Sequence, residues 1–360
     1  MALLVKIRSG GSSMIFTSEQ VSSGHPDKIC DQISDAILTE CLRQDKGSRV
    51  AVETLIKDDN VVLAGELRTD ANIDFENTVR DVLDEIGLND VSSYRIINLI
   101  SEQSPDIAQG VDTGGAGDQG MMFGYATNET PEMLPIPYVL ATKALKNLRE
   151  LKHPQLKPDA KAQVSFDYDV GQIDAFLIST QHSADMGHTA LEEVVHGVMI
   201  DTAKEFGLET DFKKLVNPTG KFVIGSSFAD SGLTGRKIIA DTYGGMARHG
   251  GGAFSGKDPS KVDRSGAYIS RKIAKDIVRK EWADRCEIQI SYAIGVAEPT
   301  SVYIETFGTE QVGIETIERY VRSFDLTPKG IIDRLDLLNV DYNLTSAYGH
   351  YWEQNLPWEK

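Results

Sequence analysis

The residues with the clearest chemical potential lie in a glycine-rich stretch of the last third of the chain. Residues 250–265 read Gly-Gly-Gly-Ala-Phe-Ser-Gly-Lys-Asp-Pro-Ser-Lys-Val-Asp-Arg-Ser. The glycines let backbone N–H groups approach a ligand closely, and Lys257, Lys261 and Arg264 supply cationic donors for phosphate oxygens. Asp263 adds the hard oxygen ligand that Mg²⁺ prefers when it also holds phosphates. Cations beside a carboxylate predict a ligand that arrives as a metal with a polyphosphate.

The stretch is not a P-loop, although residues 251–257 satisfy the first seven positions of G-x-x-x-x-G-K. The next position should carry Ser or Thr to hold Mg²⁺, and here it carries Asp258, followed by Pro259. The preceding residues 243–250 do not read as a buried strand. An ordinary flexible loop with solvated charges is the alternative to a ligand site.

Other charged residues lie in turns at the ends of expected strands and helices. His25 and Asp27 stand with Pro26 where a helical pattern begins, a natural place for anions and their metal. Plain helix capping is the alternative reading of that position. The further cations are Lys161, Arg236 and Lys237, and the carboxylates that could meet them are Asp118, Asp159 and Asp230. Each alone is typical of a surface charge, but several of them in glycine-rich turns favour a shared site.

Several familiar catalytic patterns are missing from the sequence. It contains no nucleophile elbow, no Ser-His-Asp order and no zinc-ligand spacing. This predicts a reaction in which one substrate attacks another while the protein positions them and stabilises charge. The residues alone therefore indicate a metal-dependent nucleotide enzyme, and they identify neither a base nor the second substrate.

Composition limits the class of protein. A chain of 360 residues with 41% hydrophobic and 25% charged residues is typical of a globular protein with two or three domains. Its formal charge of −17 argues against a protein that coats nucleic acid or anionic membrane. Cys30, Cys41 and Cys286 show no metal-type spacing, and no apolar run reaches transmembrane length, so we expect a cytoplasmic protein. Residues 1–13 end in Ser-Gly-Gly-Ser-Ser, and we expect them to lie outside the fold, before a natural start at Met14.

The elements that must position these residues recur three times along the chain. The first pass has a helix from Pro26, strands at 48–56 and 61–68, a helix at 75–86 and a strand at 94–100. The second has strands at 121–125, 163–169, 173–180 and 222–224, with helices at 138–151 and 188–206. The third begins at 237–241 and adds a helix after Ser265, strands at 286–294 and 301–307, and a helix at 314–324. The order predicts an α+β protein of three similar domains, each with one helix-covered face of a mixed sheet, at residues 14–112, 113–222 and 223–360.

Three motifs together carry a family resemblance. They are His25-Pro-Asp-Lys28, the glycine-rich segment at 115–125 and the stretch at 250–265. With these in order, the chain from Met14 to Lys360 closely resembles the S-adenosylmethionine synthetases, also called methionine adenosyltransferases. The resemblance implies three α+β domains with pseudo-threefold symmetry. It also implies a homodimer with active sites between subunits, often paired again into a homotetramer.

The resemblance further implies a reaction and its cofactors. The sulfur of L-methionine would attack C5′ of ATP and displace the whole triphosphate, which would then be cleaved to pyrophosphate and phosphate. Mg²⁺, with two ions per site, and K⁺ would be the cofactors. ATP and L-methionine would be the partners, with no nucleic acid and no membrane.

Residue roles follow from the same resemblance. The catalytic residues would be His25, Lys161, Arg236, Lys257 and Asp118, with His25 near the bridging oxygen at C5′ and Asp118 near the sulfur. ATP would also contact Asp159, Lys221, Phe222, Asp230, Lys237 and Ala253. Methionine would be held by Glu66, Gln103, Asp230 and Lys261. Asp27 and Asp263 would hold Mg²⁺ and Glu53 would help hold K⁺, while residues 103–113 would form a mobile lid, as their glycine-rich, weakly apolar surroundings also suggest.

The sequence departs from the family pattern at three places. Lys221 stands where the family usually has Arg, which removes a planar, bidentate donor. Residues 225–227 read Gly-Ser-Ser where Gly-Gly-Pro is more usual. The sequence ends at Lys360, whereas many relatives continue with a helical segment. If that segment was deleted, we expect effects on packing and subunit assembly with the site motifs intact.

Two other functions compete with an active synthetase. The same anion site could serve a tripolyphosphatase or another nucleotide hydrolase, although Glu66, Gln103 and Asp230 matter only if an amino acid binds. A regulatory subunit that binds nucleotide without turnover is the second alternative. All matched charged groups remain apart from the change at Lys221, which favours the enzyme.

Overall fold

The computed structural model describes residues 14–102 and 114–360. Its first repeat comprises β1 (Ile15–Val21), α1 (Pro26–Gln44), β2 (Arg49–Lys57), β3 (Asn60–Arg68), α2 (Phe75–Ile86) and β4 (Arg95–Glu102). The second comprises β5 (Gly120–Thr127), α4 (Ile136–Glu150), β6 (Leu156–Asp167), β7 (Gln172–His182), α5 (His188–Glu205) and β8 (Lys213–Val216). The third comprises β9 (Gly232–Leu233), α6 (Val262–Arg279), β10 (Arg285–Tyr292), β11 (Ser301–Glu305) and α7 (Ile314–Val321), and α8 (Pro328–Leu335) follows it. Each repeat therefore runs strand, helix, hairpin, helix, and the first two end in a further strand.

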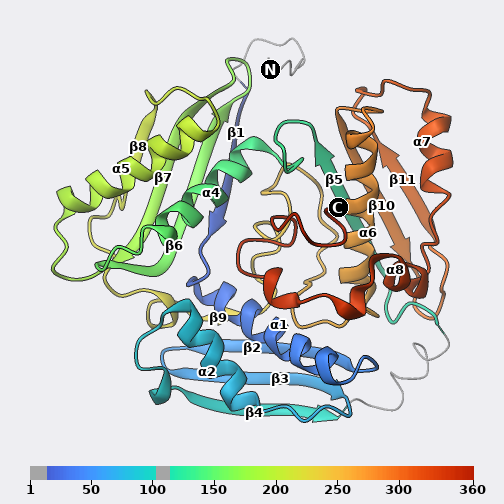
Figure 1. Ribbon diagram of the computed structural model, residues 1–360, viewed down its shortest axis with the longest axis horizontal. Coiled ribbons are helices and arrows are strands. Elements are labelled where there is room, and N and C mark those ends of the chain that lie inside the picture. Colours follow the sequence, from blue (N-terminus) through green and yellow to red (C-terminus); the bar gives the residue numbers. More distant parts are fainter. Residues whose placement is uncertain (1–13, 103–113) are drawn as a thin grey trace.

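The repeats exchange their first strands in a cycle. β1 pairs with β6 of the second repeat, β5 with β10 of the third, and β9 with β2 of the first. The resulting sheets have the orders β4-β3-β2-β9, β1-β6-β7-β8 and β11-β10-β5. In Figure 1 the exchange is visible as a blue strand in the green sheet and a green strand beside the orange ones. This cyclic exchange joins turns that are far apart in sequence.

One helix of each repeat packs against both its own hairpin and the strand that the hairpin receives. α1 contacts β2 and β9, α4 contacts β6 and β1, and α6 contacts β10 and β5. The apolar faces of α1 and α6 share one large core with their sheets, and the second repeat has a core of its own around α4 and α5. The predicted α+β class with three units is confirmed, and two of the sheets are mixed as predicted. The third sheet, β11-β10-β5, is instead antiparallel across its described strands. No helix in the described ranges is long and apolar enough to cross a lipid bilayer.

Several predicted elements are wrong in detail. Residues 222–224 form no strand, and the parallel partner of β7 is β8 instead. Residues 237–241 form a turn, because the first strand of the third repeat is the shorter β9 that precedes them. α6 begins at Val262, before Ser265, and α7 ends at Val321. The predicted domain boundaries near residues 112 and 222 remain a prediction, because each sheet combines strands from two repeats.

Candidate functional site

The N-terminus of α1 presents two of the predicted site residues. His25 is the N-cap with extended backbone angles (φ −65°, ψ 136°), and Pro26 occupies the first turn, where its missing N–H costs nothing. The Nδ1 atom of His25 accepts the N–H of Asp27 at 3.2 Å. A ring that accepts at Nδ1 and is neutral must carry its proton on Nε2. The helix start therefore presents an imidazole donor beside a carboxylate.

His25 stays neutral because of its surroundings. Its side chain is buried, and burial lowers its pKa to about 3, helped by the positive charges of Lys237 and Lys161 and opposed by Asp27 and Asp230. These four charged residues come from three different segments of the chain. Their joint influence on one imidazole shows that the fold brings them together.

The exchanged strand β1 brings Lys161 and Asp159 to this place. Val21, at the end of β1, is the register partner of Lys161 on β6. The hydroxyl of Ser22 then donates to the carbonyl of Pro158 at 2.6 Å and accepts the N–H of Ala160 at 2.8 Å. The residue between these two, Asp159, is thereby fixed against the segment that leads into His25.

Asp159 has one satisfied and one unsatisfied oxygen. Oδ2 accepts the N–H of Ser226 at 2.7 Å, whereas Oδ1 is buried with no hydrogen-bond partner within the described chain. Burial raises the pKa of Asp159 to about 6, with a further increase from Asp230 and an opposing effect from Ser226 and Lys161. An unpaired buried oxygen beside charged neighbours is typical of a position that awaits a ligand or water.

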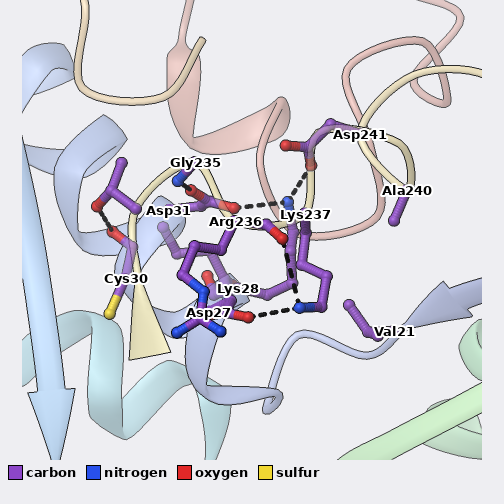
Figure 2. A network of polar contacts seen from close by, with 12 residues as sticks. Val21, Asp27, Lys28, Cys30, Asp31, Gly235, Arg236, Lys237, Ala240 and Asp241 are labelled. Atoms are coloured by element: carbon purple, nitrogen blue, oxygen red, sulfur yellow. Dashed lines mark hydrogen bonds and ion pairs between the residues drawn. The ribbon is translucent and has the colours of Figure 1, made fainter. Parts of the chain in front are cut away.

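β9 carries the remaining members of this cluster on its two flanks. Asp230 precedes it, and Arg236 and Lys237 follow it. The N–H of Leu233 donates to Oδ1 of Asp27 at 2.9 Å, which holds β9 along the start of α1. Lys237 then forms an ion pair with Asp27, and Nε of Arg236 lies 3.9 Å from the same carboxylate (Figure 2). We call His25, Asp27, Asp159, Lys161, Asp230, Arg236 and Lys237 the first group.

Lys221 and Phe222 lie in the segment that leads to Ser226, whose N–H donates to Asp159 of the first group. The N–H of Phe222 donates to Nε2 of His182 at 3.2 Å, and its carbonyl accepts the N–H of His182 at 2.9 Å. Phe222 is half-buried and fixed to the end of β7, while Lys221 is exposed. The segment that leads to Ser226, whose N–H binds Asp159, therefore carries an aromatic ring and an exposed cation.

A second set of predicted residues lies on the stretch at 250–265. Lys257 forms an antiparallel bridge with Ala51 of β2, which the preceding Gly256 makes possible. Gly256 has φ +80°, and a Cβ there would lie 1.9 Å from the carbonyl oxygen of Val52. Only glycine allows this close approach. The N–H of Gly256 donates to Asp35 of α1 at 2.9 Å, which completes the fixation.

The register of the sheet places two glutamates near Lys257. Glu66 on β3 and Lys257 are both register partners of Ala51, so the three lie in one row on one face. Glu53 follows two residues later on the same face of β2, and its side chain is exposed. Lys257 pairs with Asp263 at 2.7 Å, and Lys261 pairs with Asp258. We call Glu53, Glu66, Lys257, Lys261 and Asp263 the second group.

The remaining predicted residues relate to the second group as follows. Asp118 is exposed just before β5, whose Gly120 lies close to Asp263. Ala253 packs against Gly235, so it stands between the two groups. Gln103 and the rest of the predicted lid, residues 103–113, lie outside the described residues.

The two groups are separated within one chain. The first surrounds the start of α1, whereas Gly256, which precedes Lys257 of the second group, binds Asp35, eight residues beyond Asp27 on that helix. At a rise of about 1.5 Å per residue, this separates the two anchoring residues, Asp27 and Asp35, by about 12 Å along the axis. Each group contributes a carboxylate that is predicted to bind Mg²⁺, together with at least one of the predicted phosphate-binding cations.

Arg264 does not belong to either group, and its predicted role as a phosphate donor is wrong. Its guanidinium is fully buried and forms two bonds of 2.8 Å with Asp35. It also donates to the carbonyl of Lys257 at 2.9 Å and lies over the ring of Tyr342. Because α6 begins at Val262, Arg264 is in its first turn and points into the core.

Three charged residues behind the first group were given no role of their own from the sequence. Lys28, Asp31 and Asp241 form a buried network next to Asp27 and Lys237 (Figure 2). Lys28 and Asp31 are spaced i, i+3 on α1, which places them on one face of a helix. That spacing was a detectable signal for the helix pair, but nothing local indicated Asp241 as the third member.

The carboxylates suit a metal that is held mainly by its substrate. Among residues 14–102 and 114–360, no cluster of three or more His, Cys, Asp or Glu side chains could hold a metal ion by itself. Asp27 and Asp263 instead offer single carboxylates, each beside a lysine. Mg²⁺ at phosphate sites usually binds one or two carboxylates plus phosphate and water oxygens. The single carboxylates of Asp27 and Asp263 match this coordination.

Comparison with protein families gives a consistent result along the chain. Residues 13–105 match the model of the S-adenosylmethionine synthetase N-terminal domain. Residues 113–222 match that of the central domain, and residues 224–360 match that of the C-terminal domain. The matches follow one another in order and together cover nearly the whole sequence.

Proposed function

Since this chain belongs to the S-adenosylmethionine synthetase family and is a methionine adenosyltransferase, we propose a division of labour between the two groups. The first group binds the triphosphate and nucleoside of ATP. The second group closes over the metal-bound triphosphate and holds methionine. The observation that carries this proposal is the convergence of Asp27, Lys161 and Lys237 on the imidazole of His25.

The reaction forms a carbon–sulfur bond and breaks a carbon–oxygen bond. A lone pair of the methionine sulfur attacks C5′, and the C5′–O pair leaves with the triphosphate, so sulfur becomes a sulfonium cation. Groups that stabilise the growing negative charge accelerate the step only if they bind the leaving oxygen more strongly in the transition state. The neutral His25 ring fits this task, because its Nε2–H can donate to the bridging oxygen.

The other charges of the reaction are stabilised by cations and carboxylates of both groups. Lys161, Arg236 and Lys237 of the first group and Lys257 of the second bind the triphosphate oxygens. Asp27 and Asp263 would hold Mg²⁺, which when bound offsets negative charge on the triphosphate. Asp118 stabilises the sulfonium, and Glu53 would help hold K⁺. The same anion site then retains tripolyphosphate for cleavage to pyrophosphate and phosphate.

Recognition of the two substrates uses the flanks of the groups. Asp159 with Lys221 and Phe222 contacts the nucleoside, and Ala253 lines the same space. Glu66, Asp230 and Lys261, together with Gln103, hold the amino and carboxylate ends of methionine. Among them, Lys261 forms an ion pair with Asp258.

Two copies of the chain are needed to complete a site. Within one chain the two groups are anchored at different levels of α1, at Asp27 and at Asp35, about 12 Å apart along the helix axis. Beside the second group, the sheet face of Glu53 and Glu66 also exposes Leu55 and Leu99, by 36% and 62%. A twofold partner that covers this face would add its second group to the first group of the other copy. We propose a homodimer with shared sites, paired again into a tetramer.

One assay tests the proposed reaction against its competitors. The protein is incubated with ATP, L-methionine, Mg²⁺ and K⁺, and S-adenosylmethionine, pyrophosphate and phosphate are quantified together. We expect equal amounts of the three products. Phosphate without S-adenosylmethionine would instead show a nucleotide hydrolase, and nucleotide binding without turnover would show a regulatory protein.

A further inference from the structure

A buried triad of charged side chains lies directly behind the first group. Lys28 and Asp31 come from α1, and Asp241 comes from the loop after β9. The ammonium of Lys28 bonds Oδ2 of Asp31 at 3.2 Å and forms an ion pair with Asp241 (Figure 2). Lys28 and Asp31 are completely shielded from solvent, and Asp241 is 3% exposed.

The triad places two carboxylates on one ammonium, so it carries an excess negative charge when all three are ionised. Burial raises the pKa of Asp31 to about 7, and Asp241 adds to this while Lys28 and the N–H of Gly235 oppose it. Burial likewise raises the pKa of Asp241. Buried ionic groups of this kind are poor sources of stability, because apolar side chains of equal volume usually serve as well or better. Their presence here calls for a role other than stability.

The triad fixes the loop at Gly235–Asp241 at both of its ends. Oδ1 of Asp31 accepts the N–H of Gly235 at 2.8 Å, and the carboxylate of Asp241 pairs with Lys28. Within the loop, the N–H of Asp241 donates to the carbonyl of Lys237 at 2.8 Å. Gly235 has φ +79° and packs against Ala253, so a side chain there would clash. The loop therefore has little freedom relative to α1.

Two of the three cations of the first group lie inside this loop, and the third, Lys161, is on β6. Arg236 directly follows the fixed Gly235, and Lys237 follows it. Their partner Asp27 lies one turn before Asp31 on the same helix. One helix thus carries both the imidazole–carboxylate pair and the anchor that sets the cations opposite it.

We propose that Asp31 is a positioning residue for the phosphate-binding cations: its carboxylate, held by Lys28, fixes the N–H of Gly235 and so sets Arg236 and Lys237 against Asp27. This inference rests on the proposed function. It assigns to Asp31 no contact with substrate. Lys28, on the same helix, and Asp241, from the loop that faces it, complete the anchor.

The test replaces Asp31 by asparagine, which keeps the size of the side chain and removes its charge. The carboxylate uses one oxygen for the N–H of Gly235 and the other for the ammonium of Lys28. The amide has a single oxygen, so it can accept strongly from only one of these two donors. We expect kcat/KM for ATP to fall about tenfold at pH 8. The melting temperature should stay close to the wild-type value, because the excess buried charge is gone.

The pH dependence separates positioning from a general structural effect. In the wild type, kcat/KM for ATP should rise as the pH increases through about 7, since an ionised Asp31 accepts the N–H of Gly235 more strongly than a protonated one. Asp31→Asn should lose this rise. Isothermal titration calorimetry of MgATP at pH 6 and pH 8.5 should show the same difference in affinity, independently of turnover.

Glu359→Gln is the matched control, since Glu359 is a buried carboxylate paired with Arg271 outside both groups. It should lower the melting temperature and leave the pH dependence for ATP unchanged. A wild-type kcat/KM or an unchanged pH dependence in Asp31→Asn would overturn the inference. If the wild type makes no S-adenosylmethionine, the proposed reaction fails, and the MgATP affinities still decide the role of Asp31.

Discussion

Lys257 combines a rigid backbone with a side chain that is free to bind. Its backbone is fixed by the bridge to Ala51, while its side chain is 27% exposed and forms an ion pair with Asp263. A partly exposed ion pair contributes little to stability, on the order of 1 kcal/mol or less. The same ammonium would contribute much more when it faces a triphosphate shielded from water.

We therefore expect Lys257→Ala to reduce kcat about a hundredfold with only a small change in melting temperature. The backbone bridge and the bonds of Gly256 do not need the lysine side chain, so the loop should remain folded. Activity and thermal unfolding would be measured on the same preparation. Equal losses of stability and activity would contradict the role assigned to Lys257.

Lys329→Ala provides the comparison for this experiment. Lys329 is 80% exposed and pairs with Asp333 on α8, and neither residue belongs to the first or the second group. It should retain wild-type turnover and stability. A similar loss of turnover in Lys329→Ala would show that any removed surface lysine has this effect.

Sequence reasoning could find Lys257 but could not separate it from Arg264. Both are basic residues in one glycine-rich stretch, and both suit phosphate binding by chemistry alone. The difference lies in Asp35, a residue more than two hundred positions away that pairs with Arg264 in the core. Pairing with a residue so distant in sequence leaves no local pattern. Only the structure therefore shows that Arg264 is buried and unavailable for phosphate binding.

At the scale of elements, the turn that carries Ser226 has two features that lower the free energy of unfolding. Ser226 has φ +55°, a left-handed conformation that a non-glycine residue rarely adopts, and its hydroxyl is buried without a partner in the described chain. Its neighbour Ser227 is different, because its hydroxyl donates to the carbonyl of Asp58 at 2.7 Å. The N–H of Ser226, not its side chain, is what holds Asp159.

We expect opposite effects from two neighbouring substitutions in this turn. Ser226→Gly should raise the free energy of unfolding by about 1 kcal/mol, since it relieves the left-handed strain and removes an unpaired hydroxyl. Ser227→Ala should lower it by about 1 kcal/mol through the lost hydrogen bond. Denaturant titration of both variants measures the difference. A destabilising Ser226→Gly would mean that its hydroxyl has a partner, such as an ordered water.

The order of elements was predictable, but the pairing of the exchanged strands was not. The hairpins and helices show clear apolar periods, and the three passes were correctly read from them. β1 is less conspicuous, because Ser18 and Gln20 are buried polar residues on its inner face. β9 has only two residues. Nothing in either strand indicates that its partner belongs to another repeat, although this exchange is what assembles the first group.

At the scale of the whole molecule, the cyclic exchange divides the candidate site into two halves. β1 and β9 converge at the start of α1 and build the first group, while the stretch after β9 extends along β2 and builds the second. We propose that the cations of the two halves serve one reaction, although the halves are anchored at different levels of α1. A twofold dimer would form two equivalent sites, each built from the first group of one chain and the second group of the other.

Mixing two inactive variants tests this arrangement directly. His25→Asn damages the first group, and Lys257→Ala damages the second. Random association of equal amounts, after mild dissociation and reassembly, makes half of the dimers mixed. In each mixed dimer one shared site carries both defects and the other carries none, so about a quarter of the wild-type turnover should return. Separate measurements of each variant under the same treatment give the baseline.

The alternative makes a different prediction for the same mixture. If every site were built from one chain, each chain of a mixed dimer would still carry its own defect, and turnover would stay at the baseline. Recovery must also depend on subunit exchange, so mixing without dissociation should restore little. A mixture that never exceeds its parents, despite mixed dimers detected by native mass spectrometry, would contradict the shared site, because the two groups would then have to act within a single chain.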